Sequence, residues 1–285
     1  MKSLVIHCWG GLGSQLYAWA MAEMVEAKYP RRKVEIVFHS SGVTRRYSDL
    51  NFLGSEFEIK FRDDFISNSE SKKAPKTTNY SFKNLFKKFL HITKITLYCN
   101  NNEEFNSIKP WTLSLRGHYS YINLEVDVVK KMLLKICNEY KIPPFKSINQ
   151  DKTLCVHYRL GDLQHLETKT YIDPNNLGES IEKTMLSKKC RSLTIYSDDQ
   201  TAAQQLLHDF IPGETVFANT DVWNTLFDLI CANYFIGTNS KISLWAAIFR
   251  KTIDHHSYVY LPKQMKVAVE SNLHNVGDAM NTYYY

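Results

Sequence analysis

Residues 155–162, with the sequence CVHYRLGD, bring an imidazole, a guanidinium and a carboxylate close together after an apolar run. Because side chains alternate along a strand, His157 and Arg159 are expected on the same face. At the carboxyl end of a parallel strand, Arg159 suits bidentate recognition of a phosphate, and His157 suits a base or a phosphate. Asp162 would hold the arginine, or the charged pair would simply tie a loop.

Two aspartates follow the next apolar run, LTIY at 193–196. The carboxylate of Asp198 or Asp199 can accept the paired N–H groups of a purine edge. Either residue can equally cap the helix that is expected to start near Gln200. The sequence leaves both roles open and favours capping for at least one of the two aspartates.

A third polar segment, NSKIS at 239–243, follows the apolar residues 235–237 and begins a helix. Asn239, Ser240 and Ser243 would offer hydroxyl and N–H groups at a helix N-terminus, where anions bind. A helix cap without a ligand is the alternative.

The glycine-rich sequence GGLGSQ lies between an apolar strand and a helix. Gly10, Gly11 and Gly13 let a ligand approach the backbone, and the helix start offers N–H groups to an anion. The dinucleotide fingerprint G-x-G-x-x-G fails because Leu16 occupies its third glycine position. The loop, which ends at Gln15, is therefore either an anion site or a tight structural turn.

The sequence contains no Asp-x-Asp pair of the kind that metal-dependent sugar transferases use, and no C-x-x-C pair. We expect no metal and no cofactor. A pyrophosphate leaving group would then be neutralised by arginine and by helix N-termini.

These segments lie between elements that alternate strand and helix. Strands are expected at 4–8, 33–38, 153–158, 193–196, 234–237 and, as the last one, 258–261, and helices at 16–25, 82–90, 125–140, 201–207, 225–232 and 243–249. The order strand, turn, helix, strand predicts parallel sheets in an α/β fold. Pro143 and Pro144 mark a linker, so we expect two α/β domains, residues 1–145 and 146–285.

The composition is that of an ordinary globular protein, since 44% of the 285 residues are hydrophobic and 22% are charged. It excludes a disordered chain, a collagen-like chain and a small disulfide scaffold. No apolar run reaches 18 residues, and the first residues are better explained by a strand than by a signal peptide. The six cysteines are widely spaced, so we expect buried, reduced thiols in a cytoplasmic protein.

The net charge of +6 is local rather than spread along the chain. Seven lysines lie within residues 72–94, and no Asp, Glu or Arg lies among them. Apolar residues fall at helical spacing among the lysines of 82–90. Such a basic amphipathic helix would hold the protein peripherally on the inner face of the plasma membrane, and a solvated lysine face is the alternative. No nucleic-acid partner is expected.

Four motifs occur in an order that resembles the bacterial α-1,2-fucosyltransferases of glycosyltransferase family 11. They are GGLGSQ after the first strand, HYRLGD in mid-chain, YSDD, and NSKISLWAA near the end. The family patterns are G-G-L-G-N-Q, H-x-R-R-G-D, F-S-D-D and N-S-x-x-S-W-W-G-A, and RGHYS at 116–120 is similar to the family's G-Y-[FW]-Q segment. The resemblance covers about residues 4–262. It implies a GT-B architecture, in which two Rossmann-like domains face a central cleft, and a metal-independent, inverting transfer of L-fucose from GDP-β-L-fucose to a sugar hydroxyl.

The resemblance also implies roles for the residues that match its motifs. Arg159 would contact the β-phosphate and help GDP to leave, and His157 would lie near the nucleotide. The other matches are Asp198 or Asp199 on the guanine edge, Asn239, Ser240 and Ser243 at a phosphate-binding helix start, and Gly10, Gly11, Gly13 and Gln15 in a loop of the acceptor half that faces the cleft.

Several positions depart from the family pattern. Leu160 replaces its second motif arginine, as an apolar residue does in the related protein O-fucosyltransferases. Ser14, Ser120 and Leu244 replace an asparagine, a glutamine and a tryptophan. These changes leave another GDP-linked deoxysugar or hexose open as the donor.

We therefore expect an enzyme that moves a sugar, most simply L-fucose, from a GDP-sugar to a hydroxyl of a bacterial surface-glycan precursor, such as a lipid-linked O-antigen or capsule unit. Asp162 is a candidate catalytic base beside Arg159, and a mechanism with little general-base help is also compatible. Two other interpretations stay open. One is a nicotinamide-dependent oxidoreductase with Glu35 as the ribose-binding acid, and the other is a non-catalytic module that binds a nucleotide or a glycan.

Overall fold

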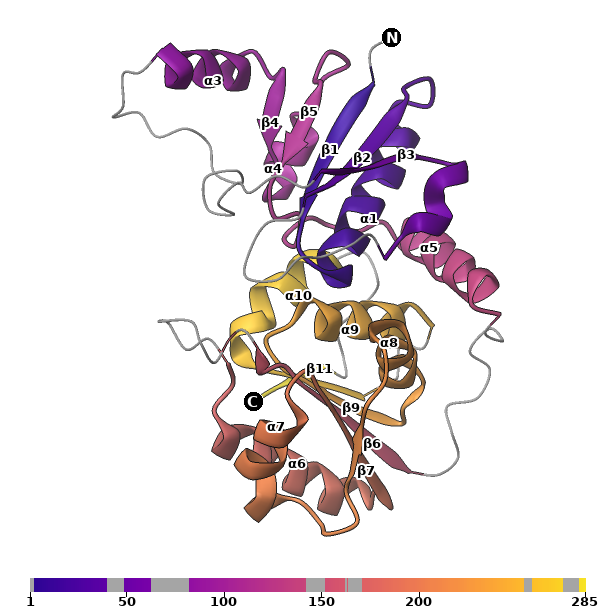
Figure 1. Cartoon of the computed structure of the whole chain (residues 1–285), viewed down its shortest axis with the longest axis vertical. Coiled ribbons are helices and arrows are strands. Elements are labelled where there is room, and N and C mark those ends of the chain that lie inside the picture. The colour runs from indigo at the N-terminus through magenta and orange to yellow at the C-terminus, as the bar shows by residue number, and fades with distance from the viewer. Residues whose placement is uncertain are drawn as a thin grey trace. The chain divides into compact units, whose positions relative to one another are not determined.

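The computed structural model describes residues 3–39, 49–62, 82–141, 152–161, 163, 171–253, 258–273 and 282–285. The chain divides into two compact units, Met1–Val128 and Val129–Tyr285, and each contains its own parallel sheet (Figure 1). The division falls in the first turn of helix α5 (Val126–Glu139), earlier than the boundary between 145 and 146 expected from the sequence. The proline pair at 143–144 lies outside the described residues.

Aromatic packing at the end of α5 explains why this helix belongs with the second unit. Tyr140 directly follows α5, and its ring lies 5.0 Å from that of Trp223 and 5.5 Å from that of Phe227, measured between centroids. Both partners belong to helix α8 (Val222–Cys231). The helix is therefore attached to elements that follow it in the chain, which its own periodicity does not reveal.

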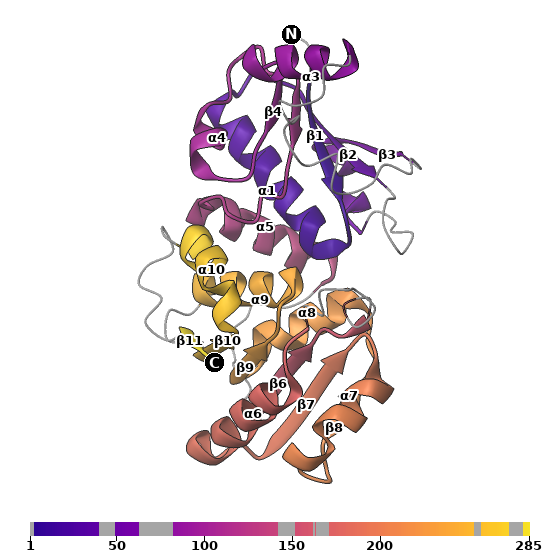
Figure 2. The same ribbon diagram turned by 90° about the vertical axis from the view of Figure 1, so that its left-hand side faces the viewer.

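The described residues of the first unit form a five-stranded sheet with helices between its strands. The strands are β1 (Leu4–Trp9), β2 (Val34–His39), β3 (Glu58–Arg62), β4 (Thr96–Tyr98) and β5 (Ser114–Arg116), and the helices are α1 (Leu12–Lys28), α3 (Phe82–Ile92) and α4 (Asn102–Asn106), with a 3-10 turn at Asn51–Ser55. All pairings are parallel and the order is β3-β2-β1-β5-β4, which places β1 in the middle (Figure 2).

Burial of β1 and α1 fixes the loop that joins them. Leu4 and Ile6 of β1 are fully buried, as expected for the central strand of a parallel sheet. In α1 the intervening residues Ala18 and Trp19 are buried as well as the predicted apolar face. A helix that is apolar nearly all round needs cover on more than one side. The glycine loop is therefore held between two well-packed elements.

In the part of the second unit that the structure describes, six strands form one parallel sheet. They are β6 (Thr153–Tyr158), β7 (Ser192–Ser197), β8 (Val216–Ala218), β9 (Tyr234–Gly237), β10 (Tyr258–Leu261) and β11 (Thr282–Tyr284), and the remaining helices are α6 (Pro174–Lys188), α7 (Gln200–Leu207), α9 (Lys241–Ile253) and α10 (Lys266–Leu273), with 3-10 turns at His208–Phe210 and Lys263–Met265. The order β8-β7-β6-β9-β10-β11 is 3-2-1-4-5-6 when strands are counted within the unit. This is the strand order of the Rossmann fold.

Helices cover both faces of the second sheet. Helices α6 and α7 lie on one face, and α8 and α9 lie on the other (Figures 1 and 2). Alternate residues of β6, including Leu154, Val156 and Tyr158, pack into the core formed with α6 and α7. By alternation His157 points to the opposite face, toward α9. The pleat of one strand thus divides its residues between the core and the site.

The α/β class, with a Rossmann-like sheet in each half, is confirmed. The prediction that 258–261 is the last strand was wrong, because β11 adds a further strand beside β10. Sequence patterning also missed β3, β4, β5, β8, α4, α6 and α10. Helix α6 was not predicted because only a narrow stripe of its surface is buried, formed by Leu177, Gly178, Ile181 and Thr184.

All six cysteines carry free thiols. Cys8, Cys99, Cys137 and Cys155 are buried, while Cys190 and Cys231 are partly exposed. Burial raises the pKa of the Cys155 thiol to about 12, so this group is protonated at neutral pH. Among the residues that the structure describes, no helix is long and apolar enough to cross a membrane.

A buried arginine joins two helices and a strand of the second unit. Arg250 of α9 is 2% exposed. Its guanidinium donates to the carbonyls of Leu229, Ile230, Ala232, Asn233 and Tyr258. The first of these lie in the last turn of α8, whose carbonyls have no partner within the helix. One side chain therefore satisfies the end of α8 and the start of β9.

Replacing Arg250→Met is expected to lower the free energy of unfolding by about 3 kcal/mol, because several buried carbonyls lose their donor. Urea unfolding followed by tryptophan fluorescence would measure the change. Arg191→Met, at an exposed arginine, is the matched control and should stay within about 0.5 kcal/mol of the parent. An equal loss in both variants would contradict this role of Arg250.

Candidate functional site

The second sheet reverses its order of strands between β6 and β9. The chain leaves β6 toward β7 on one side and leaves β9 toward β10 on the other, while β6 and β9 pair directly, with His157 opposite Gly237. In open α/β sheets, ligands bind outside the carboxyl ends of the strands at such a reversal. The segments 157–161 and 237–243 begin there, so the fold brings together two of the motifs singled out in the sequence.

A threonine hydroxyl bridges the two strand ends. Thr238 is fully buried. Its Oγ1 donates to the carbonyl of His157 at 2.9 Å and accepts the backbone N–H of Arg159 at 2.9 Å. Its own N–H donates to Oγ of Ser243 at 3.1 Å. This Thr238 bridge fixes the backbone on both sides of the reversal.

The imidazole of His157 is fixed by the first turn of α9. Its Nδ1 lies 2.8 Å from Oγ of Ser243, and both side chains are buried. Burial, followed by the nearby charge of Arg159, lowers the pKa of His157 to about 3. The imidazole is therefore uncharged at neutral pH and acts as a hydrogen-bonding group.

The guanidinium of Arg159 is held by an aspartate from the neighbouring strand end. Its Nη1 lies 3.0 Å from Oδ2 of Asp198, with the two side chains 25% and 31% exposed. The other oxygen of Asp198 accepts the N–H of Leu160 at 2.9 Å. A Cβ at Gly161 would overlap this carboxylate, so the close approach requires glycine. The pair is thus built into the turn that follows β6.

The other residues predicted for this site are not part of the Arg159–Asp198 pair or the Thr238 bridge. Asp199 caps α7, since its Oδ1 accepts the N–H of Ala202 at 3.0 Å. Ser240 precedes α9, and its Oγ accepts the N–H of Ile242 at 3.2 Å. Asn239 is exposed at the same turn. Asp162 lies outside the described residues.

This arrangement has the chemistry of an anion site. The guanidinium of Arg159 is only one-quarter exposed. Thr238, which accepts the backbone N–H of Arg159, lies three residues before α9, a helix of 13 residues whose N-terminal N–H groups and dipole favour negative charge. The uncharged His157 and the bridge behind it position these groups without adding charge. A phosphate or diphosphate fits the combination.

The glycine loop lies at the corresponding edge of the first sheet. Gly10 has φ +113°, which favours glycine, and Gly11 precedes α1. Gly13 and Gln15 lie in the first turn of α1 and are buried. The Gln15 side chain is engaged by backbone, because its Nε2 donates to Gly10 O at 3.4 Å and its Oε1 accepts the N–H of Asp49 at 2.8 Å.

Sequence reasoning missed a stacked cluster beside this loop, at the carboxyl ends of β1, β2 and β5. Nδ1 of His7 lies 2.8 Å from Nε2 of His39, and the ring of Trp9 stacks on that of His39 with centroids 4.5 Å apart. The guanidinium of Arg116 lies 5.8 Å from the Trp9 ring. Burial, and to a smaller extent the nearby charge of Arg116, lowers the pKa of His7 to about 3.

The signal for this cluster was present in the sequence. His7 and Trp9 are two residues apart at the end of an apolar strand and so share one face, as His157 and Arg159 do in the second unit. Nε1 of Trp9 is buried and has no hydrogen-bond partner among the described residues. Partners from three strands complete the cluster, which no local pattern could have shown. Within the described part of the chain, His, Cys, Asp and Glu form no group that could hold a metal ion.

No protein-family model matches the chain, and no curated protein matches its sequence. Solved structures resemble its fold. POFUT1 in complex with GDP-fucose is 11% identical with a TM-score of 0.41, covering 91% of this chain and 97% of that one. E. coli heptosyltransferase WaaC with ADP is 9% identical with a TM-score of 0.46, covering 99% and 92%. A glycosyl transferase family 9 structure from Veillonella parvula is 8% identical with a TM-score of 0.44, covering 91% and 80%.

The uncharged His157 predicts a loss of stability in acid. Its pKa of about 3 in the folded protein lies below the ordinary 6.5, so between these values the unfolded chain binds a proton that the folded chain does not. This contribution is complete above pH 6.5 and falls as the pH decreases toward 3, by up to about 1.4 kcal/mol per pH unit. We expect urea unfolding between pH 7 and pH 4 to show that the free energy of unfolding falls less steeply with decreasing pH in His157→Asn than in the parent protein.

His208→Asn serves as the control, because His208 is exposed and its side chain is 85% accessible. This variant should keep the pH dependence of the unfolding free energy that the parent protein shows. An unchanged pH dependence in His157→Asn would contradict the assignment of a buried, uncharged imidazole.

Proposed function

We propose that the second unit binds a GDP-linked sugar, most simply GDP-β-L-fucose, and that the protein transfers the sugar to a glycan hydroxyl with inversion. The observation that carries this proposal is Arg159, whose guanidinium Asp198 holds at the reversal point of a Rossmann-type sheet and whose backbone Thr238 ties to the segment that leads into α9. A diphosphate is the ligand that this combination suits best.

The proposed reaction needs no covalent intermediate. The acceptor hydroxyl attacks the anomeric carbon on the face opposite to GDP. The bond from this carbon to the β-phosphate oxygen breaks, and its electron pair stays on the phosphate, which gives GDP and an inverted product. Arg159 and the N-terminus of α9 stabilise the charge that develops on the departing phosphate.

The acceptor proton passes to solvent or to a base. Asp162 is the base candidate that the sequence offers, next to the turn that holds Arg159. We assign no other side chain of the second unit to this role, since the imidazole of His157 has a pKa of about 3 and is a poor proton acceptor at neutral pH.

The four sequence motifs support guanine and fucose as parts of the donor. If Asp198 bound the guanine base, its carboxylate would also bond to Arg159 and Leu160. If Asp199 bound it, that carboxylate would also bond to Ala202. Carboxylate oxygens accept more than one hydrogen bond, so sharing is chemically possible. A bacterial surface glycan, such as an O-antigen or capsule precursor, is the acceptor class that the motifs favour.

The position of Glu35 counts against the nicotinamide alternative. A ribose-binding acid belongs at the carboxyl end of the second strand, near the glycine loop. Glu35 is the second residue of β2 and lies four residues, about 13 Å, before His39 at its end. Its Oε2 is also paired with Nζ of Lys60 at 2.8 Å.

Helix α3 supports a second proposal, that the protein contacts an anionic membrane surface. Its apolar side chains face solvent, with exposed fractions of 53% for Leu85, 55% for Phe86, 56% for Phe89 and 66% for Ile92. These positions recur at helical spacing, and Lys87 and Lys88 between them are exposed. An exposed apolar stripe flanked by lysines suits the interface of a lipid bilayer. A lipid-linked acceptor would give this contact a purpose.

Calorimetry with GDP, UDP and NAD tests the donor proposal. GDP is expected to bind, and Arg159→Ala should weaken it roughly tenfold or more, because a charge-assisted hydrogen bond to phosphate is lost. The same variant should abolish release of GDP from GDP-fucose in the presence of an acceptor glycan while the protein stays folded.

Arg191→Ala removes an exposed arginine of the same unit and should leave both readouts unchanged. Binding of NAD without binding of GDP would overturn the donor proposal. GDP binding without turnover of any GDP-sugar, across a screen of donors and acceptors, would point to the non-catalytic module.

Co-sedimentation with vesicles tests the membrane proposal. Binding is expected with phosphatidylglycerol and not with phosphatidylcholine alone, and Lys87→Glu with Lys88→Glu should remove it, since each lysine near the surface contributes about 1 kcal/mol. Phe86→Ser with Phe89→Ser should also weaken it. The control pair Lys263→Glu and Lys266→Glu keeps the net charge of the double variant and should still bind. Equal binding by all variants would discard the idea.

A further inference from the structure

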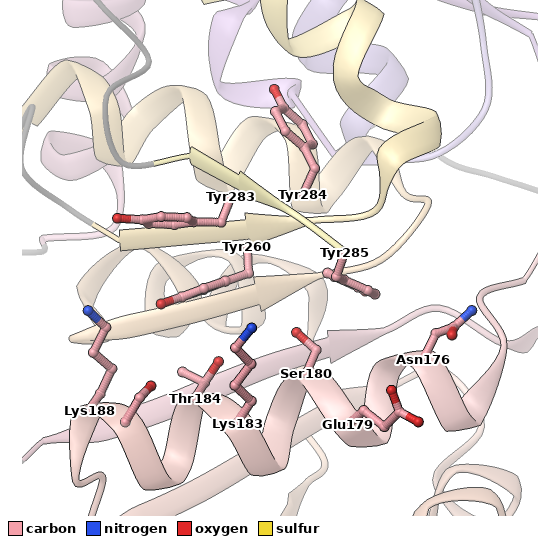
Figure 3. A pocket seen from close by; sticks show the side chains of 11 residues that line it. Asn176, Glu179, Ser180, Lys183, Thr184, Lys188, Tyr260, Tyr283, Tyr284 and Tyr285 are labelled. Carbon is pink, nitrogen blue, oxygen red and sulfur yellow. The ribbon is translucent and has the colours of Figure 1, made fainter.

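The second unit contains a pocket that no part of the proposed donor site explains. It has a volume of about 560 Å³ and lies between helix α6 and strands β10 and β11 (Figure 3). This is within the range of small-molecule sites in proteins. We call it the tyrosine pocket, since Tyr260 and Tyr283–Tyr285 line it on the side opposite α6, with the ring of Tyr284 pointing away from α6 (Figure 3).

Every side chain that lines the tyrosine pocket carries a polar group. Helix α6 supplies hydroxyl, amide, carboxylate and ammonium groups, and the strands supply tyrosines. No purely aliphatic side chain is part of the lining. Such a surface is poorly suited to an apolar ligand or to the apolar face of another helix, and well suited to a ligand rich in hydroxyl groups.

The tyrosine rings form a stacked platform. The rings of Tyr260 and Tyr283 lie 5.0 Å apart between centroids with an interplanar angle of 21°, and those of Tyr258 and Tyr283 lie 6.2 Å apart at 10°. Tyr283 is 43% exposed. Aromatic faces carry partial negative charge and attract the weakly positive C–H groups of a sugar ring. Burial and the neighbouring tyrosines raise the pKa of Tyr260 to about 12, so its hydroxyl keeps its proton.

Two lysines of α6 make one end of the pocket cationic. Lys183 and Lys188 point from the helix toward the tyrosine rings (Figure 3), and Nζ of Lys188 lies 3.9 Å from the centroid of Tyr258. Glu179 is the acidic residue of the lining. From Asn176 to Lys188 the helix is about 18 Å long, which suits an extended chain of several rings better than a single flat base.

We propose that the tyrosine pocket binds an acidic oligosaccharide, with sugar rings on the tyrosine platform and a carboxylate or phosphate group near Lys183 and Lys188. The proposal goes beyond the donor site, because the pocket shares no residue with the Arg159 site. One hydrogen bond connects the two regions, from the hydroxyl of Tyr285 to the carbonyl of Gly237 at 2.9 Å. A glycan-extending enzyme would use such a pocket to retain its acceptor or product.

Calorimetry with defined hexasaccharides tests the proposal on the full-length protein. The probes are acidic hexasaccharides of hyaluronan, polygalacturonate and polysialate, with maltohexaose as the neutral comparison. At least one acidic probe should bind, roughly tenfold more tightly than maltohexaose. Lys183→Glu with Lys188→Glu should weaken it by roughly tenfold or more, and Tyr283→Ser should weaken it at least about threefold.

Lys130→Glu with Lys266→Glu is the matched control, because both lysines are exposed and lie on α5 and α10. It should bind the acidic probe as the parent protein does. GDP affinity, measured in parallel, should be the same in all variants, so loss of the donor site and loss of the pocket are distinguished. No binding of any acidic probe at millimolar concentration, equal binding by the charge-reversed variant, or competition by GDP would overturn the proposal.

Discussion

The second unit depends on the bridge that Thr238 makes where its sheet reverses direction. Parallel strands β6 and β9 stop pairing there, and their backbone groups need other partners. One hydroxyl, accepting from Arg159 and donating to His157, joins the two strand ends. The same threonine reaches Ser243 through its N–H. The backbone at Arg159, the imidazole of His157 and the start of α9 therefore share one fixed frame, and a ligand need not order them when it binds.

Patterning located the strands that carry the site of the second unit, but not the partners of its side chains, and in the first sheet it located only β1 and β2. The apolar runs of β6 and β9 locate His157 and Ser243, because buried parallel strands read as continuous apolar segments. The sequence offers Asp162 as the partner of Arg159, whereas Asp198 holds its guanidinium. That carboxylate is 39 residues away along the chain and becomes a neighbour only because β7 pairs with β6. Thr238 lies in none of the sequence motifs, and its role arises only because β6 and β9 end side by side.

The two units use the same edge of a parallel sheet for different chemistry. The second unit places the guanidinium of Arg159 at a strand end, where Asp198 holds it. The first unit stacks imidazole and indole rings from β1 and β2 at the equivalent edge, with the Arg116 guanidinium 5.8 Å from the Trp9 ring, and its glutamine is occupied by backbone. An aromatic surface with hydrogen-bonding nitrogens suits neutral polar ligands, and a guanidinium suits anions. Fold alone would not distinguish the two halves, since their difference lies in a few side chains at strand ends.

The bond between Tyr285 and Gly237 has a thermodynamic consequence for the second unit. Tyr285 lines the tyrosine pocket, and Gly237 directly precedes the Thr238 bridge. A ligand that shifts this tyrosine alters a carbonyl one peptide from the bridge. Any resulting change in nucleotide affinity must be matched by an equal change in glycan affinity, because coupling between two binding sites is reciprocal.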